Sequence, residues 1–223
     1  MAPDPVPAPV PAATVVLVRD GEAGVEVLML RRDSRVAFGG MWAFPGGRIE
    51  PDDLVPGDEQ AGARRAAVRE AAEECGLALP AEGLVPFAFW VPPPTVPRRF
   101  ATWFFLAGAT ATPVTVDDGE IREHRWLAPG AVLDLHRGGE VDLAAPTWIT
   151  LDDLAGLPDV DTALAAARDR APLPRYATRA ITVEGGMLAC WEGDAAYAGG
   201  DLAATGGRNR LWMVGARWRR EVG

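Results

Sequence analysis

The alternation of apolar and polar positions divides the first half of the chain into strand-like segments. Residues 14–32 contain two β-branched runs around the turn sequence DGEAG, which predicts a hairpin. Apolar runs at 84–91 and 99–109 predict two more strands, joined by the proline-rich loop PPPTVP, and 122–127 predicts a short one.

Residues 59–75 give the clearest helical pattern. Asp58 is suited to cap the start of this helix, and Gly76 is suited to end it. Small residues recur every four positions along one side, so we expect close packing against a sheet that also buries a cysteine. They are Ala63, Ala67, Ala71 and Cys75.

The second half of the chain predicts helices first and strands afterwards. Three shorter helices are predicted at 129–139, 146–157 and 159–171. A hairpin that turns at Gly185-Gly186 is predicted within 179–194, and a strand pair within 209–221. Strands and helices are interleaved without a regular βαβ repeat, so we expect an α/β protein with a mixed sheet and helices on its faces.

Composition suggests three regions. Residues 1–13 contain five prolines and no periodicity, which is typical of a flexible tail. Residues 14–171 are expected to form the main α/β domain, and 172–223 a β-rich C-terminal extension. A homodimer contact and a lid remain two alternative roles for that extension.

Charge and cysteine usage exclude several classes of protein. The net charge is −9, which argues against binding to nucleic acid backbones. No apolar run reaches the ~18 residues of a membrane helix. Two cysteines cannot build a disulfide framework, and no signal peptide is recognisable, so we expect a cytoplasmic protein without a membrane partner.

The predicted helix 59–75 carries an unusual set of carboxylates. Glu73 and Glu74 follow Glu70 by three and four residues, so all three project to one side. Like charges at this spacing destabilise a helix unless a cation offsets them, and Mg²⁺ prefers oxygen ligands. A bound divalent metal could then activate water beside a phosphate. The alternative is an ordinary solvated acidic face, which is a common feature of helices.

Arg69 lies beside these acids but about 100° round the helix from Glu70. Its guanidinium could reach Glu73 one turn on, or a carboxylate in the upstream turn PGGRIEPDD, whose glycines permit close approach. The second arrangement would lock the turn to the helix. The acids that the turn offers are Glu50, Asp52 and Asp53.

The turn and the helix together resemble the Nudix box, which is Gly, five residues, Glu, seven residues and Arg-Glu-aliphatic-x-Glu-Glu-x-Gly-aliphatic. The first half matches at Gly47 and Asp53, where Asp replaces the usual Glu. The intervening residues 54–68 number fifteen, a surplus of eight, which predicts a longer entry to the helix through Pro56-Gly57. The second half matches at Arg69, Glu70, Ala71, Glu73, Glu74, Gly76 and Leu77.

This resemblance implies a Nudix hydrolase, an α/β/α sandwich that uses Mg²⁺ or Mn²⁺ to cleave a diphosphate linked to another moiety. It implies that Glu70, Glu73 and Glu74 bind the metal, and that one of them helps to deprotonate water. The Gly46 carbonyl would complete the metal shell, and Asp53 and Arg69 would form an orienting pair.

A narrower resemblance extends over residues 14–157. The segments FPGGR, PRRFATWFFLA and HRWLAPGAVLDLHRGGEVDLAAPTWITLDDLA are similar to the branch that contains peroxisomal coenzyme A diphosphatases and their bacterial relatives. Glu50 stands where that branch usually has Asp. This likeness implies coenzyme A or an acyl derivative as the small-molecule nucleotide substrate. The alternatives are NADH, ADP-ribose, a nucleoside triphosphate, or a catalytically idle Nudix fold that binds a nucleotide or a protein.

Charged residues outside the box offer further candidates. Arg98 and Arg99 follow a proline loop and could bind substrate phosphates through paired hydrogen bonds, or could be a surface pair. The resemblance to Nudix enzymes also implies an acid on a loop away from the box, which Glu120 or Glu123 could supply, with Glu120 as the first choice. Solvated loop acids are an equally good interpretation of both.

Aromatic side chains could stack on a nucleotide base, although aromatics beside strands more often belong to the core. The candidates are Trp42, Phe44 and Trp103. His124 and His136 lack the spacing of metal ligands or catalytic groups, so both are interpreted as structural or surface residues.

Overall fold

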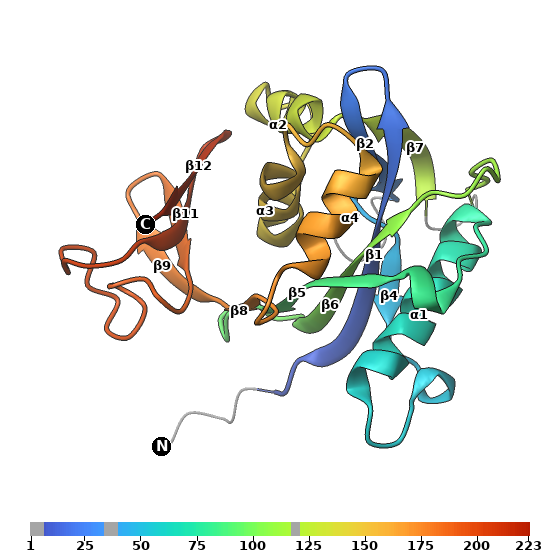
Figure 1. Ribbon diagram of the computed structural model, residues 1–223. Coiled ribbons are helices and arrows are strands. Elements are labelled where there is room, and N and C mark those ends of the chain that lie inside the picture. The colour runs from blue at the N-terminus through green and yellow to red at the C-terminus, as the bar shows by residue number, and fades with distance from the viewer. Residues whose placement is uncertain (1–6, 34–39, 117–120) are drawn as a thin grey trace.

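The computed structural model describes residues 7–33, 40–116 and 121–223, which form two β-sheets and four α-helices (Figure 1). The larger sheet has the strand order β3-β2-β1-β6-β5-β8, with β4 paired to β1 and β7 paired to β2. Its strands are β1 (Val10–Gly21), β2 (Gly24–Arg32), β3 (Trp42–Ala43), β4 (Gly46–Arg48), β5 (Val85–Val91), β6 (Phe100–Gly108), β7 (Ile121–Leu127) and β8 (Arg175–Ala177).

This sheet is mixed, as the interleaved pattern predicted. Strands β1 and β2 form the expected antiparallel hairpin, and β5 and β6 are also antiparallel. The pairs β1–β6 and β5–β8 are parallel. Strands β5 and β6 therefore join the N-terminal hairpin to the short strand β8, which arrives from far along the sequence.

The expectation of a flexible tail over residues 1–13 is wrong for its last part. Strand β1 begins at Val10, where Val10 pairs with Phe100 and Ala12 with Thr102 in the parallel ladder to β6. Pro11 has no N–H to donate, but its carbonyl accepts a hydrogen bond from the Ile49 N–H, at 3.0 Å. The last four residues of this proline-rich segment, 10–13, therefore belong to strand β1.

Helices cover both faces of the large sheet. They are α1 (Glu59–Cys75), α2 (Pro129–Arg137), α3 (Ala145–Leu154) and α4 (Val160–Arg168). Side chains alternate along β1, so Val15 belongs to the buried cluster under α1 and Val16 to the cluster under the other three helices. The result is the predicted α/β/α sandwich (Figure 1).

Helix α1 has the bounds that its end residues predicted. The Asp58 carboxylate accepts a hydrogen bond from the Ala61 N–H at 2.9 Å, which caps the N-terminus. Gly76 ends the helix in the left-handed conformation, with φ of 66°. Ala63, Ala67 and the buried Cys75 thiol pack against the sheet as expected. Two 3-10 turns flank the helix, at Pro51–Asp53 and Ala81–Gly83.

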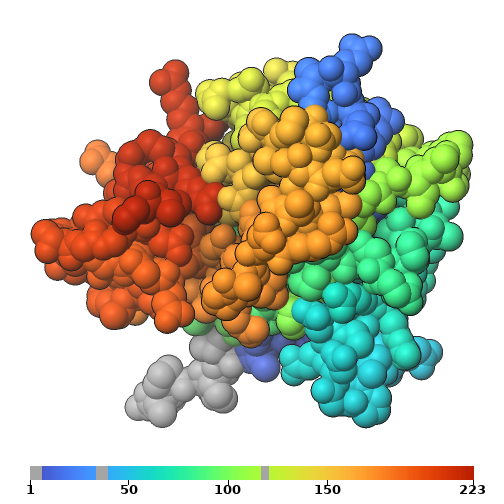
Figure 2. Space-filling model, viewed as in Figure 1, coloured from blue at the N-terminus to red at the C-terminus, as the bar shows by residue number. Residues whose placement is uncertain are grey.

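The C-terminal strands form a second, antiparallel sheet with the order β12-β11-β10-β9. They are β9 (Arg179–Val183), β10 (Gly186–Cys190), β11 (Asn209–Val214) and β12 (Arg217–Val222). This sheet forms a lobe beside the helices (Figure 2), and Trp218 packs against Trp148 of α3 with 6.4 Å between ring centroids. The Arg220 guanidinium forms an ion pair with Asp153 of α3 at 2.5 Å. None of the described helices is long and apolar enough to span a bilayer.

Candidate active site

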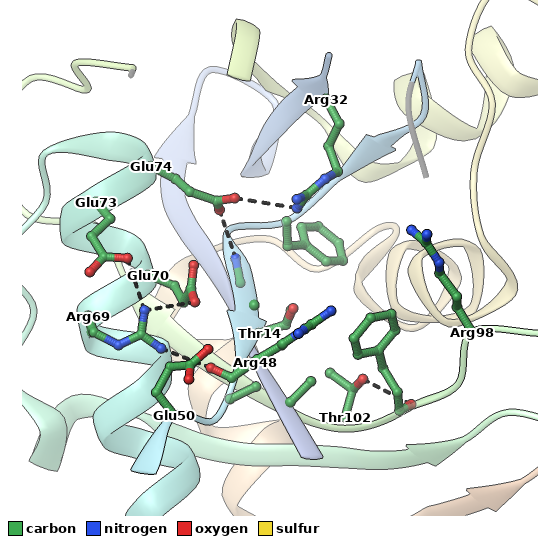
Figure 3. Close-up of a pocket in the computed structure, with 16 residues that line it drawn as sticks. Thr14, Arg32, Arg48, Glu50, Arg69, Glu70, Glu73, Glu74, Arg98 and Thr102 are labelled. Atoms are coloured by element: carbon green, nitrogen blue, oxygen red, sulfur yellow. Dashed lines mark hydrogen bonds and ion pairs between the residues drawn. The ribbon is translucent and has the colours of Figure 1, made fainter. Parts of the chain in front are cut away.

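A cavity of about 660 Å³ lies between α1, the start of β1, and β4 (Figure 3). Glu70, Glu73 and Glu74 line it from the last two turns of α1, so the three carboxylates do share one side of the helix. Gly46 and Gly47 line it from β4. We call this space the active-site cavity.

Arg69 makes both of the contacts that its position allowed. Its Nη1 donates to Glu73 Oε2 and to Glu70 Oε1, each at 2.9 Å. Its Nη2 donates to Asp53 Oδ2 at 3.0 Å and to the Arg48 carbonyl at 2.8 Å. One guanidinium therefore ties the turn, the strand β4 and two of the helix acids together.

Asp53 is held in place from its own side as well. Its Oδ2 accepts a hydrogen bond from the Glu50 N–H at 2.9 Å, across the 3-10 turn Pro51–Asp53. The surplus residues lead outward from Asp53 through Gly57, and α1 then returns past the turn. A Cβ on Gly62 would lie only 3.3 Å from the Asp53 carbonyl oxygen. The longer entry to the helix thus leaves Asp53 beside Arg69.

The two glycines of β4 allow the glutamates to approach the strand. A Cβ on Gly47 would lie 2.3 Å from Glu70 Oε1, and a Cβ on Gly46 would lie 2.5 Å from the Ala13 carbonyl oxygen. The Gly46 N–H donates to Glu74 Oε2 at 2.9 Å. Any larger residue at these positions would displace a carboxylate or the neighbouring strand.

Burial and charge set the protonation behaviour of the site. Burial raises the pKa of the Glu70 carboxyl, although the neighbouring Arg69 lowers it again in part. The hydrogen bond to Asp53 contributes most to raising the pKa of Arg69, so this guanidinium stays charged. Glu74 is only 5% exposed and forms an ion pair with Arg32 Nη1 at 3.4 Å.

The donor set fits a hard divalent cation, because all three side chains are carboxylates that line one cavity. Within the described ranges, no group of three or more His, Cys, Asp or Glu side chains is arranged to hold a metal ion. Each glutamate is engaged instead by a basic or backbone donor: Glu70 and Glu73 by Arg69, and Glu74 by Gly46.

Three further arginine side chains line the cavity together with the glutamates, and one of them, Arg32, is paired with Glu74 (Figure 3). They are Arg32, Arg48 and Arg98, all of which line it. Sequence reasoning identified Arg98 but missed the other two, which lie at the ends of β2 and β4. Arg99 points elsewhere: its guanidinium donates to the carbonyls of Pro7 and Pro92, at 2.9 and 3.1 Å. Arg98 therefore lines the active-site cavity and Arg99 does not.

The aromatic candidates separate in the same way. Phe44 lines the active-site cavity, whereas Trp42 is 5% exposed and belongs to the core cluster beneath the sheet. Trp103 lies on the α1 face of β6, where its ring is 4.9 Å from that of Phe89 and 6.4 Å from that of Phe105. Trp42 is thus a core residue, and Trp103 is half-buried and packs against the core cluster under α1.

The remaining candidates lie outside the cavity or outside the described residues. Glu120 falls in the second group. Glu123 forms ion pairs with Arg125 at 2.5 Å and with Arg31 at 3.8 Å. His136 is buried with its Nδ1 3.0 Å from the Val141 carbonyl, which agrees with a structural role.

Comparisons with known proteins agree with this geometry. The family model described as NUDIX domain matches residues 8–149. A Caenorhabditis elegans protein named "Putative nudix hydrolase 7" is 26% identical over 208 residues, which cover 77% of this chain and 69% of that protein.

Solved structures share the fold. The crystal structure of a Nudix hydrolase from Alicyclobacillus acidocaldarius has a TM-score of 0.65 at 25% identity, covering 71% of this chain and 96% of that one. The Nudix domain of Shewanella oneidensis NrtR, crystallised with ADP ribose, has a TM-score of 0.51 at 18% identity. The match covers 68% of this chain and 90% of that one. Because the family model matches more than half of its residues, this chain belongs to the Nudix family.

Proposed function

We propose that this Nudix pyrophosphohydrolase cleaves the diphosphate of a nucleoside diphosphate derivative in the active-site cavity, with Glu70, Glu73 and Glu74 as ligands of Mg²⁺ or Mn²⁺. The observation that carries this proposal is that three carboxylates and three arginines line one cavity. An anionic diphosphate needs cationic partners on both sides, and a metal-loaded acidic face opposite arginines would supply them.

The bound metal would polarise the phosphoryl group and the attacking water. Arg48 and Arg98 are placed to bind phosphate oxygens from the side opposite α1. Arg69 fixes the side chains of Glu70 and Glu73. The Gly46 carbonyl is proposed as a further metal ligand, because the Gly46 N–H already holds Glu74 at this point.

We assign to Glu70 the task of accepting the proton of the attacking water. Burial raises the pKa of its carboxyl, which makes its carboxylate a stronger base. The water oxygen forms a bond to phosphorus, the bridging P–O bond breaks, and the bridging oxygen leaves with its electron pair. Asp53 acts one step further out, by holding Arg69.

Coenzyme A or an acyl derivative is the first substrate we propose, on the sequence likeness described above. NADH, ADP-ribose and nucleoside triphosphates are the alternatives within the same reaction class. A fold that only binds a nucleotide would not need a complete set of carboxylates, so the intact set of Glu70, Glu73 and Glu74 favours an enzyme. We also propose residues 14–171 as the catalytic unit.

The test is a substrate panel with Mg²⁺ or Mn²⁺ that contains coenzyme A, NADH, ADP-ribose and nucleoside triphosphates. Glu74→Gln should lower kcat at least about a hundredfold, because it removes a charged ligand. Glu82→Gln, an exposed change in the 3-10 turn Ala81–Gly83, serves as the matched control. Absence of turnover with every compound, or full activity in Glu74→Gln, would contradict the proposal.

A further inference from the structure

A second cavity, of about 670 Å³, lies between the large sheet and the C-terminal sheet. Its volume is typical of a small-molecule site. Most of its lining is apolar, and Arg98 supplies the charge among the described residues that line it. The apolar side chains include Trp90, Val91, Val96, Phe100, Phe104, Met187 and Met213. We call this space the apolar cavity.

The apolar cavity adjoins the active-site cavity. Thr14, Arg98, Phe100 and Thr102 line both of them. A molecule whose diphosphate lies between the glutamates and Arg98 could therefore extend directly into the apolar cavity. The lining changes along this path, from charged arginine and glutamate side chains in the active-site cavity to mostly apolar side chains in the apolar cavity.

The C-terminal sheet builds the far wall of this cavity with one of its faces. Met187 pairs with both Met213 and Thr182 in the ladder, and Ala189 pairs with Ala180 one step along. Residues paired side by side share a face of the sheet, and all five line the cavity. The wall lies beyond residue 149, where the match to the family model ends.

Threonines are also present in the lining, but two of their hydroxyl groups are already bonded within the protein. Thr102 Oγ1 donates to the Phe100 carbonyl at 3.3 Å. Thr178 Oγ1 accepts from Trp191 Nε1 at 3.0 Å. Hydroxyls engaged in this way leave their methyl groups as the contact surface, which suits hydrocarbon better than a sugar or a base.

We propose that the apolar cavity binds an apolar chain carried by the substrate on the far side of its diphosphate, so that the C-terminal sheet selects substrates with such a chain. This inference rests on the proposed function, because it places the diphosphate in the active-site cavity. A polar group such as ribose would lose hydrogen bonds to water there and gain few in return.

An apolar chain on a diphosphate can come from two sources, and two substrate series separate them. In prenyl diphosphates from five to fifteen carbons the chain is joined directly to the diphosphate. In acyl coenzyme A thioesters from two to twelve carbons it follows the pantetheine arm. In the series that fits, kcat/KM should rise about threefold for each methylene that enters the cavity, until the cavity is full. ADP-ribose, with a polar group in that place, serves as the reference.

Two exposed residues of the C-terminal sheet provide matched variants. Met187 lines the apolar cavity and is 43% exposed, so Met187→Glu would place a charge in the wall with little cost to folding. Val214 is 36% exposed and follows Met213 on the other face of β11, outside the lining. Met187→Glu should reduce the ratio of long-chain to short-chain kcat/KM about tenfold. Val214→Glu should leave this ratio unchanged.

Direct binding separates failure of this inference from failure of the proposed function. Dodecyl phosphate should bind the unmodified protein more tightly than butyl phosphate by calorimetry, and Met187→Glu should reduce the ratio of the two affinities about tenfold. Turnover of ADP-ribose or short-chain compounds with no dependence on chain length would overturn the inference alone. If no diphosphate is hydrolysed, the proposed function fails, and equal binding of the two alkyl phosphates would then overturn the inference as well.

Discussion

Arg69 and Asp53 are sixteen positions apart, yet the Arg69 guanidinium donates through both Nε and Nη2 to the Asp53 carboxylate, the shorter contact being 3.0 Å. Asp53 is only 5% exposed, so this ion pair is shielded from water. The same guanidinium holds Glu70 and Glu73. The pair therefore transmits the position of the turn to the proposed metal ligands.

Asp53→Asn should lower kcat/KM by about ten- to a hundredfold, because it weakens the support of the glutamates without touching them. The apparent affinity for Mg²⁺ should fall in parallel, as measured by metal titration of the activity. Asp52→Asn, an exposed change one residue earlier, is the control. Equal activity in the two variants would show that the Asp53–Arg69 pair only stabilises the fold.

Gly47→Ala is predicted to impair catalysis through a steric effect. Its Cβ would meet Glu70 Oε1 at 2.3 Å, so the carboxylate must move. We expect kcat to fall at least about tenfold, with a loss of stability of about 1–3 kcal/mol. Gly130→Ala is the matched control, since no atom lies within 4 Å of its Cβ. Steady-state kinetics and urea unfolding test both variants; wild-type kcat in Gly47→Ala would contradict this account of the glycine.

The neighbouring arginines should behave differently when each is replaced by Ala. Arg98 lines the active-site cavity, so Arg98→Ala should raise KM about tenfold or more by removing a charged hydrogen bond to phosphate. Arg99 binds the Pro7 and Pro92 carbonyls, so Arg99→Ala should leave KM unchanged and lower the thermal midpoint. Substrate titrations and calorimetry distinguish the two, and a similar change in KM for both would contradict the assignment.

The C-terminal sheet should lose stability in acid through Asp194. Burial alone would raise its pKa, but hydrogen bonds from Arg210 and from the Asn209 and Ala196 N–H groups outweigh burial and lower the pKa to about 2. An ordinary aspartate has a pKa of 3.8. Because the folded pKa is the lower one, the contribution is complete above about pH 4 and disappears as the pH falls through 2.

The expected loss is about 2 kcal/mol between pH 5 and pH 2, followed by urea unfolding with Trp fluorescence. The double variant Asp194→Asn, Arg210→Met removes both charges and should lack this part of the pH dependence. The Asp194 and Arg210 side chains are 0% and 3% exposed, so salt should have little effect on the difference. The same slope in the double variant would assign it to other carboxylates.

The sequence predicted those elements whose ends are marked by a capping residue or a turn glycine. Asp58 and Gly76 fix the two ends of α1, and Gly185 fixes the turn of the β9–β10 hairpin. The two- and three-residue strands β3 and β4 are too short to show a period of two. Strand β8 exists because the edge of β5 is available to pair with it, which no local pattern reveals.

The site residues likewise divide into those that local spacing predicted and those that long-range pairing places. The helix acids could be predicted because a 3.6-residue period places them on one side. Arg32 and Arg48 could not, because they reach the cavity from separate strands through long-range pairing. Arg98 and Arg99 are adjacent in sequence, yet Arg98 lines the cavity while Arg99 binds the Pro7 and Pro92 carbonyls, a difference set by contacts that no local pattern reveals.

The pairing of β8 with β5 has a consequence for anyone who shortens this chain. Phe89 pairs with Arg175 and Val91 with Ala177, so β8 covers the outer edge of the large sheet. A chain ended at residue 171 would expose that edge, whose free N–H and C=O groups invite other molecules to add a strand. A chain ended at Thr178 would keep the edge covered but uncover Trp90, which packs against Trp191. Aggregation of the chain ended at residue 171, but not of the chain ended at Thr178, would therefore report an open sheet edge.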